Sequence, residues 1–152
     1  MNKKLFTAIL STALCLNFAM IVFAQQKPEV MVKQRQAAMI LQGKYFGPLG
    51  GMAQGKVLYD AKTVDRNAGY LLVLAKMPWD GFDPITAGEK SAALPAVYSE
   101  AAKFKAAADD MQVAVAKLVS VSKGKDEASI KGAMSAVGKT CGGCHENFRQ
   151  KP

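Results

Sequence analysis

One stretch after Pro95 constrains the fold of this chain more than any other. Apolar or small residues follow one another there at alternating steps of four and three, at Val97, Ala101, Phe104, Ala108, Met111, Val115, Leu118 and Ser122. This heptad spacing places them along one face of a long helix, which needs other helices to cover it. A half-buried strand would alternate at steps of two, and no segment of the sequence does so.

A first helix is predicted to begin at Pro28-Glu29, because proline at the first position and an acid in the first turn favour a helix start. Gly47-Pro48 and Gly50-Gly51 should loosen or end it. Its inward stripe reads Val32, Arg35, Met39, Gln42 and Phe46. The charge of Arg35 on such a stripe needs an anionic partner.

Two further segments repeat the helical spacing. One runs through Val57, Ala61, Val64, Ala68, Leu71 and Ala75 and stops at Met77-Pro78; the other runs through Ile130, Met134, Val137, Cys141, Cys144 and Phe148. Short breaks separate the helices, except for a long loop over residues 78–95, and long loops in compact domains are usually functional. The sequence therefore predicts an all-α fold, an antiparallel up-down-up-down four-helix bundle.

Composition narrows the class of protein. A chain of 152 residues is expected to form one domain, and 50% hydrophobic with 21% charged residues fits neither a disordered tail nor a collagen-like repeat. The formal charge is +8, but no basic run with interleaved aromatic residues suggests nucleic-acid binding. A single histidine excludes any site that needs two imidazoles.

Residues 1–24 have the form of a secretory signal peptide. A basic start is followed by an uncharged apolar stretch that ends in Val22-Phe23-Ala24. We therefore expect cleavage after Ala24, export to the periplasm, and a mature domain over residues 25–152 with no membrane attachment. Removal of Lys3 and Lys4 leaves 18 basic and 12 acidic side chains, a charge of +6.

Three alternatives to that cleavage remain open. The cut could follow Ala19, or the apolar stretch could stay as an anchor, since it is about long enough to span a bilayer. A lipid on Cys15 is disfavoured because Leu14 stands where a lipoprotein signal needs a small residue.

The string Cys141-Gly142-Gly143-Cys144-His145 matches the attachment signature of c-type haem. Two thiols bind the vinyl groups of the porphyrin and the adjacent imidazole ligates the iron. On a helix, Cys144 lies three residues and His145 four residues after Cys141, so all three share one face. The two glycines keep side-chain bulk away from the macrocycle.

A C-x-x-C pair also occurs in structural zinc sites and in thiol oxidoreductases. A structural zinc site would lack a fourth protein ligand. A thiol oxidoreductase could cycle a C-x-x-C pair between dithiol and disulfide, but that chemistry normally follows a strand in a βαβ unit. Neither matches this helical chain as well as haem c does.

Four features together resemble the cytochrome c prime family of class II c-type cytochromes, over nearly all of the mature chain. They are the haem motif on the last helix, Arg35-Gln36-x-x-Met39 on the first, Pro78-Trp79-x-x-Phe82 in the loop, and Arg149 after the haem motif. The resemblance implies a periplasmic four-helix bundle, commonly a homodimer, with high-spin iron held by one protein ligand. It also implies that nitric oxide and carbon monoxide bind at the haem.

The resemblance assigns roles to individual residues. Cys141 and Cys144 would attach the haem covalently, and His145 would be the axial ligand of its iron. Arg149 matches the arginine on the same face as that histidine. Arg35 and Gln36 match the pair at the haem edge, where a guanidinium can offset a propionate.

Met39 matches the position that covers the opposite, distal face of the haem. In cytochrome c prime this residue blocks the sixth site of the iron, whereas in the low-spin branch of the class a methionine binds there. Trp79 and Phe82 match residues that wall the distal pocket, which favours the first reading. The segment Ser91-Ala92-Ala93-Leu94 departs from many relatives because it offers few polar groups to the second propionate.

The sequence thus favours a haem-binding protein for diatomic gases that also passes single electrons. No acid-base group is evident in the distal pocket, so we do not expect an enzyme. The alternatives are a six-coordinate electron-transfer cytochrome with Met39 as the sixth ligand and, more remotely, a haem-free thiol oxidoreductase. An exposed apolar stripe on the first two helices would support a homodimer.

Overall fold

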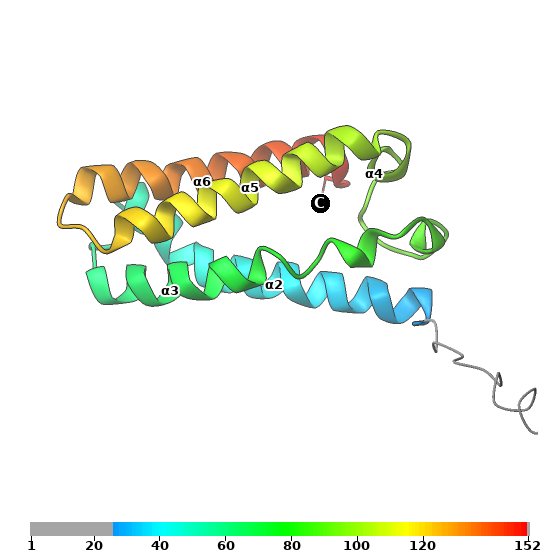
Figure 1. The fold of residues 1–152 in the computed structure, drawn as a ribbon, viewed down its shortest axis with the longest axis horizontal. Coiled ribbons are helices and arrows are strands. Elements are labelled where there is room, and N and C mark those ends of the chain that lie inside the picture. The colour runs from blue at the N-terminus through cyan, green and yellow to red at the C-terminus, as the bar shows by residue number, and fades with distance from the viewer. Residues whose placement is uncertain (1–25, 152) are drawn as a thin grey trace, which may run out of the picture.

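A computed structural model describes residues 26–151, in which four long helices form an antiparallel bundle (Figure 1). These helices are α2 (Pro28–Ala53), α3 (Ala61–Leu74), α5 (Ala101–Ser122) and α6 (Glu127–Phe148). The predicted all-α, up-down-up-down architecture is confirmed. The predicted signal peptide over residues 1–24 lies outside the described residues.

Helix α2 begins at Pro28 as predicted but continues through Pro48, where the sequence suggested a weakening or an end. Proline removes one backbone donor and crowds the carbonyl one turn earlier, but Leu49, directly after it, is fully buried. The side chain of Asn67 on α3 donates to the Tyr45 carbonyl oxygen at 3.0 Å, which ties the two helices together at this point. Tertiary packing thus keeps the helix intact beyond its proline.

Helix α3 begins later than its periodicity indicated. Asp60 is its N-cap and accepts hydrogen bonds from the backbone N–H of Lys62 at 3.1 Å and from the Thr63 hydroxyl at 2.6 Å. This cap fixes the start at Ala61, so Val57 lies outside the helix and is exposed.

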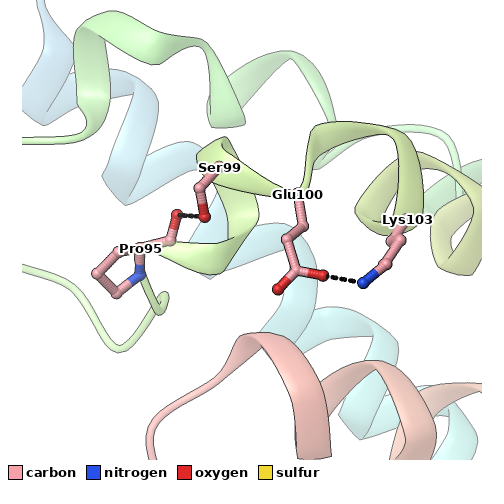
Figure 2. A network of polar contacts seen from close by, with 4 residues as sticks. All are labelled: Pro95, Ser99, Glu100 and Lys103. Atoms are coloured by element: carbon pink, nitrogen blue, oxygen red, sulfur yellow. Dashed lines mark hydrogen bonds and ion pairs between the residues drawn. The ribbon is translucent and has the colours of Figure 1, made fainter.

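The long helix predicted after Pro95 is interrupted. A short helix α4 (Ala96–Ser99) ends at Glu100, whose φ and ψ of −116° and 41° are not helical, and α5 follows. Figure 2 shows the junction: the Ser99 hydroxyl donates to the Pro95 carbonyl oxygen at 3.4 Å, and Lys103 pairs with the Glu100 carboxylate at 2.5 Å. The chain can therefore turn before α5 while the heptad face from Phe104 onward is preserved.

The hydrophobic core lies between the four long helices and is built from the predicted stripes. Its largest fully buried side chains include Leu49, Val64, Val115, Leu118, Ile130, Met134 and Val137. Within residues 26–151 no helix has the length and apolar character needed to cross a membrane.

The loop between α3 and α4 crosses the end of the bundle and is tied to the end of α6. It contains two short 3-10 helices, η2 (Asp80–Phe82) and η3 (Pro84–Thr86). A β-bridge pairs Ala93 with Arg149, supported by backbone hydrogen bonds from Leu94 to Phe148 at 2.9 Å and from Gln150 to Ala92 at 2.8 Å. These contacts hold the loop beside the helix that carries the haem motif.

Candidate functional site

A cavity of about 550 Å³ opens between the helices at the end of the bundle where the loop crosses. All four long helices and the loop contribute to its walls. The lining residues are Arg35, Gln36, Met39, Ile40, Gln42, Gly43, Phe46, Leu71, Ala75, Phe82, Ser91, Ala92, Ala93, Phe104, Met111, Val115, Val137, Cys141, Cys144, His145, Phe148 and Arg149. Eight of the nine residues singled out in the sequence are among them, and Trp79 is not.

The three residues of the haem motif lie half-buried on the last two turns of α6 and face this one cavity. Burial raises the pKa of the Cys141 and Cys144 thiols. Burial, reinforced by the nearby charge of Arg149, lowers the pKa of His145. The imidazole is therefore biased toward its neutral form, the form that ligates a metal.

The pKa shifts of the thiols are relevant to the alternative function as a thiol oxidoreductase. Reactive thiols in redox proteins have lowered pKa values, so a raised pKa at Cys141 and Cys144 disfavours a dithiol reagent. In the described part of the chain, no three His, Cys, Asp or Glu side chains are grouped to hold a metal ion.

Arg35 is 3% exposed and lines the cavity from α2. Its Nη1 donates to the Gly81 carbonyl oxygen at 2.5 Å, to Thr86 Oγ1 at 3.0 Å and to Tyr98 Oη at 3.3 Å. Its Nη2 donates to Ser91 Oγ at 3.0 Å. Every one of these partners is neutral, and among residues 26–151 the anionic partner expected from the sequence is absent.

Three other predicted residues reach the cavity from different sides. Met39 is half-buried, one turn after Arg35 on α2, and Gln36 lies beside it with an exposed side chain. Arg149 lies at the end of α6, one turn after His145, and is exposed. The cavity thus has a methionine from the first helix and a histidine from the last among its walls.

The two aromatic residues of the loop have different positions. Phe82 lines the cavity, and the Arg35 guanidinium carbon lies 4.3 Å from the centroid of its ring. Trp79 packs behind the wall, with its ring centroid 6.3 Å from that of Phe82 and 5.9 Å from that of Phe104. Its indole N–H donates to the Ala75 carbonyl oxygen at 2.6 Å, so Trp79 supports the wall rather than forming it.

The sequence did not single out several lining residues. Phe46 closes the cavity next to two glycines: a Cβ at Gly50 would lie 3.2 Å from its ring, and one at Gly138 would lie 3.1 Å from it. Phe104 and Phe148, with ring centroids 5.2 Å apart, form another part of the wall. The predicted inward stripes contain all three aromatic residues, but a stripe does not distinguish a cavity wall from solid core.

The loop segment Ser91–Ala93 also lines the cavity. The sequence predicts few polar groups in this segment. Ser91 is the exception, since its hydroxyl oxygen accepts a hydrogen bond from Arg35. The small side chains there leave space that larger residues would fill.

The donor set and the shape of the cavity fit a covalently attached haem. Two thiols and an imidazole on one helix face supply both attachment points and an axial ligand, and the walls opposite are mostly apolar. A volume of about 550 Å³ falls in the range of cofactor sites. A buried guanidinium with only neutral partners is suited to a carboxylate at the edge of a cofactor.

Comparisons with known proteins agree with this fit. Residues 30–149 match the family profile described as cytochrome C′. Cytochrome c′ of Rubrivivax gelatinosus is 43% identical over 127 residues, which cover 83% of this chain and 98% of that protein. Its crystal structure superposes with a TM-score of 0.77 over 82% of this chain and 98% of that one.

A second solved structure is the nitric oxide complex of a leucine-to-alanine mutant of cytochrome c prime from Alcaligenes xylosoxidans. It has a TM-score of 0.76 at 34% identity and covers 83% of this chain and 98% of that chain. Members of the family carry covalently attached haem c. This chain is therefore a haem c protein that belongs to the cytochrome c′ family.

Proposed function

We propose that this chain is a periplasmic haem protein with five-coordinate, high-spin iron, which binds nitric oxide and carbon monoxide and also passes single electrons. It is a binding protein and not an enzyme. The alternatives differ in what occupies the sixth position of the iron, and Met39 is the residue that decides between them.

The observation that carries the proposal is the chemistry of the cavity walls. Among the described residues, the titratable side chains that line it are the two motif cysteines, His145 and the guanidinium groups of Arg35 and Arg149. No Asp, Glu, Lys or second His in that range is a lining residue, so a general acid or base for peroxidase or oxygenase chemistry is missing. Walls that are mostly apolar favour small neutral ligands over water.

When bound, the haem supplies an iron centre that can take a diatomic gas as an additional ligand or accept and release one electron. The protein provides the neutral imidazole of His145 on one side and the apolar side chains of Met39 and Phe46 among the other walls. A methionine thioether is flexible, so Met39 can move aside for a small ligand. The nitric oxide complex of the Alcaligenes mutant supports this ligand class for the present chain.

A second candidate function is electron transfer with Met39 as sixth iron ligand. One observation favours it: the Met39 side chain is half-buried and lines the same cavity as His145. Methionine with histidine is a common axial pair in electron-transfer cytochromes.

Replacement of Met39 by Ala distinguishes the two functions. Under our proposal the M39A protein keeps a high-spin spectrum and binds carbon monoxide faster, because the distal wall is opened. If Met39 is the sixth ligand, the wild type is low-spin and M39A becomes high-spin. Met77→Ala is the matched control, since Met77 is 52% exposed and does not line the cavity.

The proposed periplasmic location depends on removal of residues 1–24 during export. N-terminal sequencing of the protein from a periplasmic fraction should begin at Gln25. A start at Gln25 is expected, and retention of the first 24 residues on a membrane-bound protein would contradict the location.

The proposal includes a homodimer formed through the outer faces of α2 and α3. Leu41, Tyr70 and Val73 are exposed there, and the rings of Tyr45 and Tyr70, 4.7 Å apart, place these parts of the two helices side by side. A two-fold interface uses the same patch on both subunits. Val73→Lys should convert a dimer to a monomer in light-scattering measurements. Val113→Lys is the control and should leave the dimer intact, because Val113 is exposed on α5, away from this face.

A further inference from the structure

The hydrogen bonds of Arg35 form a cage that reaches well beyond the cavity wall. Its four acceptors come from three separate parts of the chain: Gly81 and Thr86 in the first part of the loop, Ser91 later in the loop, and Tyr98 on α4. Phe82 lies against the face of the guanidinium. Within residues 26–151, no other side chain is hydrogen-bonded to as many residues that lie far from it in the sequence.

The two hydroxyl protons of this cage can be assigned from their acceptors. The Thr86 hydroxyl lies 2.7 Å from the Asp83 carbonyl oxygen, to which only the hydroxyl can donate. Its oxygen is then the acceptor for Tyr98 Oη at 2.9 Å, so the Tyr98 hydroxyl donates to Thr86. The free lone pairs of both oxygens accept from Arg35, and each group therefore restricts the orientation of the next.

The cage holds the guanidinium without neutralising it. Its partners are two hydroxyl groups of the loop, one phenol and one carbonyl, while the Nε of Arg35 makes no hydrogen bond within residues 26–151. Arg35 thus keeps its full positive charge at the wall of the haem cavity.

Gly81 shows how closely the loop is fitted to this charge. A Cβ on Gly81 would lie 2.8 Å from the Cβ of Arg35 and 3.0 Å from the Met31 carbonyl oxygen. Any larger residue would push the loop away from α2 and lengthen the bond from Arg35 to the Gly81 carbonyl oxygen.

We propose that Thr86, Ser91 and Tyr98 are positioning residues that fix the charge of Arg35 beside the haem and thereby raise its reduction potential. This inference rests on the proposed haem site but not on which gas it binds. A positive charge held in a poorly screened site favours the reduced haem, which carries one electron more. A guanidinium free to turn toward water is screened and favours it less.

The test is the midpoint potential of the holoprotein in variants that each remove one part of the cage. Arg35→Gln removes the charge and should shift the ferric-to-ferrous equilibrium toward ferric by about tenfold, about 59 mV for one electron. Tyr98→Phe and Thr86→Val keep the charge but loosen its cage, and should shift it in the same direction by a smaller factor. Arg35→Lys should have a midpoint potential between those of Arg35→Gln and the wild type. Lysine keeps the positive charge but lacks the planar set of N–H donors that the cage binds.

Tyr59→Phe is the matched control, since Tyr59 precedes α3 and does not line the cavity. Thermal unfolding is measured alongside, because loss of a buried hydrogen bond lowers stability whether or not the cage acts on the haem. Tyr98→Phe with a lowered melting temperature and an unchanged potential would overturn the proposal. The same result for Ser91→Ala, the mildest change, would do so even if Arg35→Gln failed to fold.

The experiment distinguishes failure of the cage proposal from failure of the proposed gas-binding function. The midpoint potential can be measured for five-coordinate or six-coordinate iron, so a low-spin spectrum would refute the gas-binding function and leave the cage testable. Conversely, a high-spin, gas-binding protein whose potential ignores the cage variants would refute only the cage.

Discussion

The two ends of the bundle differ in packing: one has a core filled by side chains, and the other encloses a cavity. Val64, Leu118, Ile130 and Met134 are fully buried in the core toward the turn between α5 and α6. This turn lies at the left of Figure 1. Toward the loop and the end of α6, the same helices enclose a cavity. One half is a core of side chains and the other is a core completed by a cofactor.

The difference follows from what occupies the same kind of helix position. In the filled half the inward stripes of α5 and α6 carry large aliphatic side chains. In the open half the stripes continue with Arg35 and Met39 on α2 and with two cysteines separated by glycines on α6. On α6 the sequence Cys-Gly-Gly-Cys places no large side chain opposite the apolar walls, so the helices enclose space there that a cofactor can fill.

The largest effect is expected from removing the covalent bond between the open half and its cofactor. Cys141→Ser combined with Cys144→Ser should abolish haem that survives denaturation, as seen by haem staining of denaturing gels. Hydrogen exchange should then increase around the cavity while the filled half stays protected. Equal loss of protection in both halves would contradict the division.

A cavity made in the filled half should lower the stability of the protein but leave the haem site unchanged. Met134 is 0% exposed, and Met134→Ala should lower the free energy of unfolding by about 3 kcal/mol. Denaturant titration measures this loss. Because Met134 does not line the haem cavity, the visible spectrum should match that of the wild type, and a changed spectrum would show that the halves are coupled.

Gly81→Ala tests how closely the loop packs against α2. The new Cβ would meet Arg35 and Met31, and overpacking of this kind costs about 2 kcal/mol. Gly88→Ala is the control, because a Cβ at Gly88 would have no atom within 4 Å. Similar melting temperatures for the two variants would show that the loop is not closely fitted here.

The smallest effect concerns the N-cap of α6, far from the haem. Hydrogen bonds from Ser129 and from the backbone hold the pKa of Asp126 below its usual 3.8. The stabilisation is fully present above that value and is lost as the pH falls through the lower pKa of the folded state. Asp126→Asn, which still caps, should be nearly as stable as the wild type at pH 7.

The same variant should lose less stability in acid than the wild type, since it has no carboxyl group to protonate. Urea midpoints measured at pH 7 and in acid provide the comparison. An identical acid loss in both proteins would exclude Asp126 as a source of the pH dependence.

Much of the fold could be predicted from periodicity, because the stripes that contain Met111, Val115, Met134 and Val137 are buried as expected. The boundaries could not. Asp60 caps α3 after Val57, and Glu100 interrupts the helix predicted after Pro95, because caps and turns depend on local hydrogen bonds that a heptad count does not contain. Packing of Leu49 preserved α2 beyond Pro48.

Some residues of the site could also be predicted from the sequence, and others could not. The motif residues Cys141, Cys144 and His145 could be located because haem attachment demands a fixed spacing on one helix. Thr86 and Tyr98 could not, since an ordinary threonine and tyrosine in a loop and a short helix become partners of Arg35 only when the loop folds back on α2. Trp79 matched a motif, yet it lies behind Phe82 rather than at the surface of the cavity.

The central claim is that the open half of the bundle holds a haem whose sixth position is available to a gas. The visible spectrum of the purified protein, oxidised, reduced, and reduced under carbon monoxide, tests it most directly. A broad high-spin spectrum that sharpens and shifts its Soret band under carbon monoxide is the result this account expects. A sharp, split low-spin spectrum that carbon monoxide leaves unchanged would contradict it.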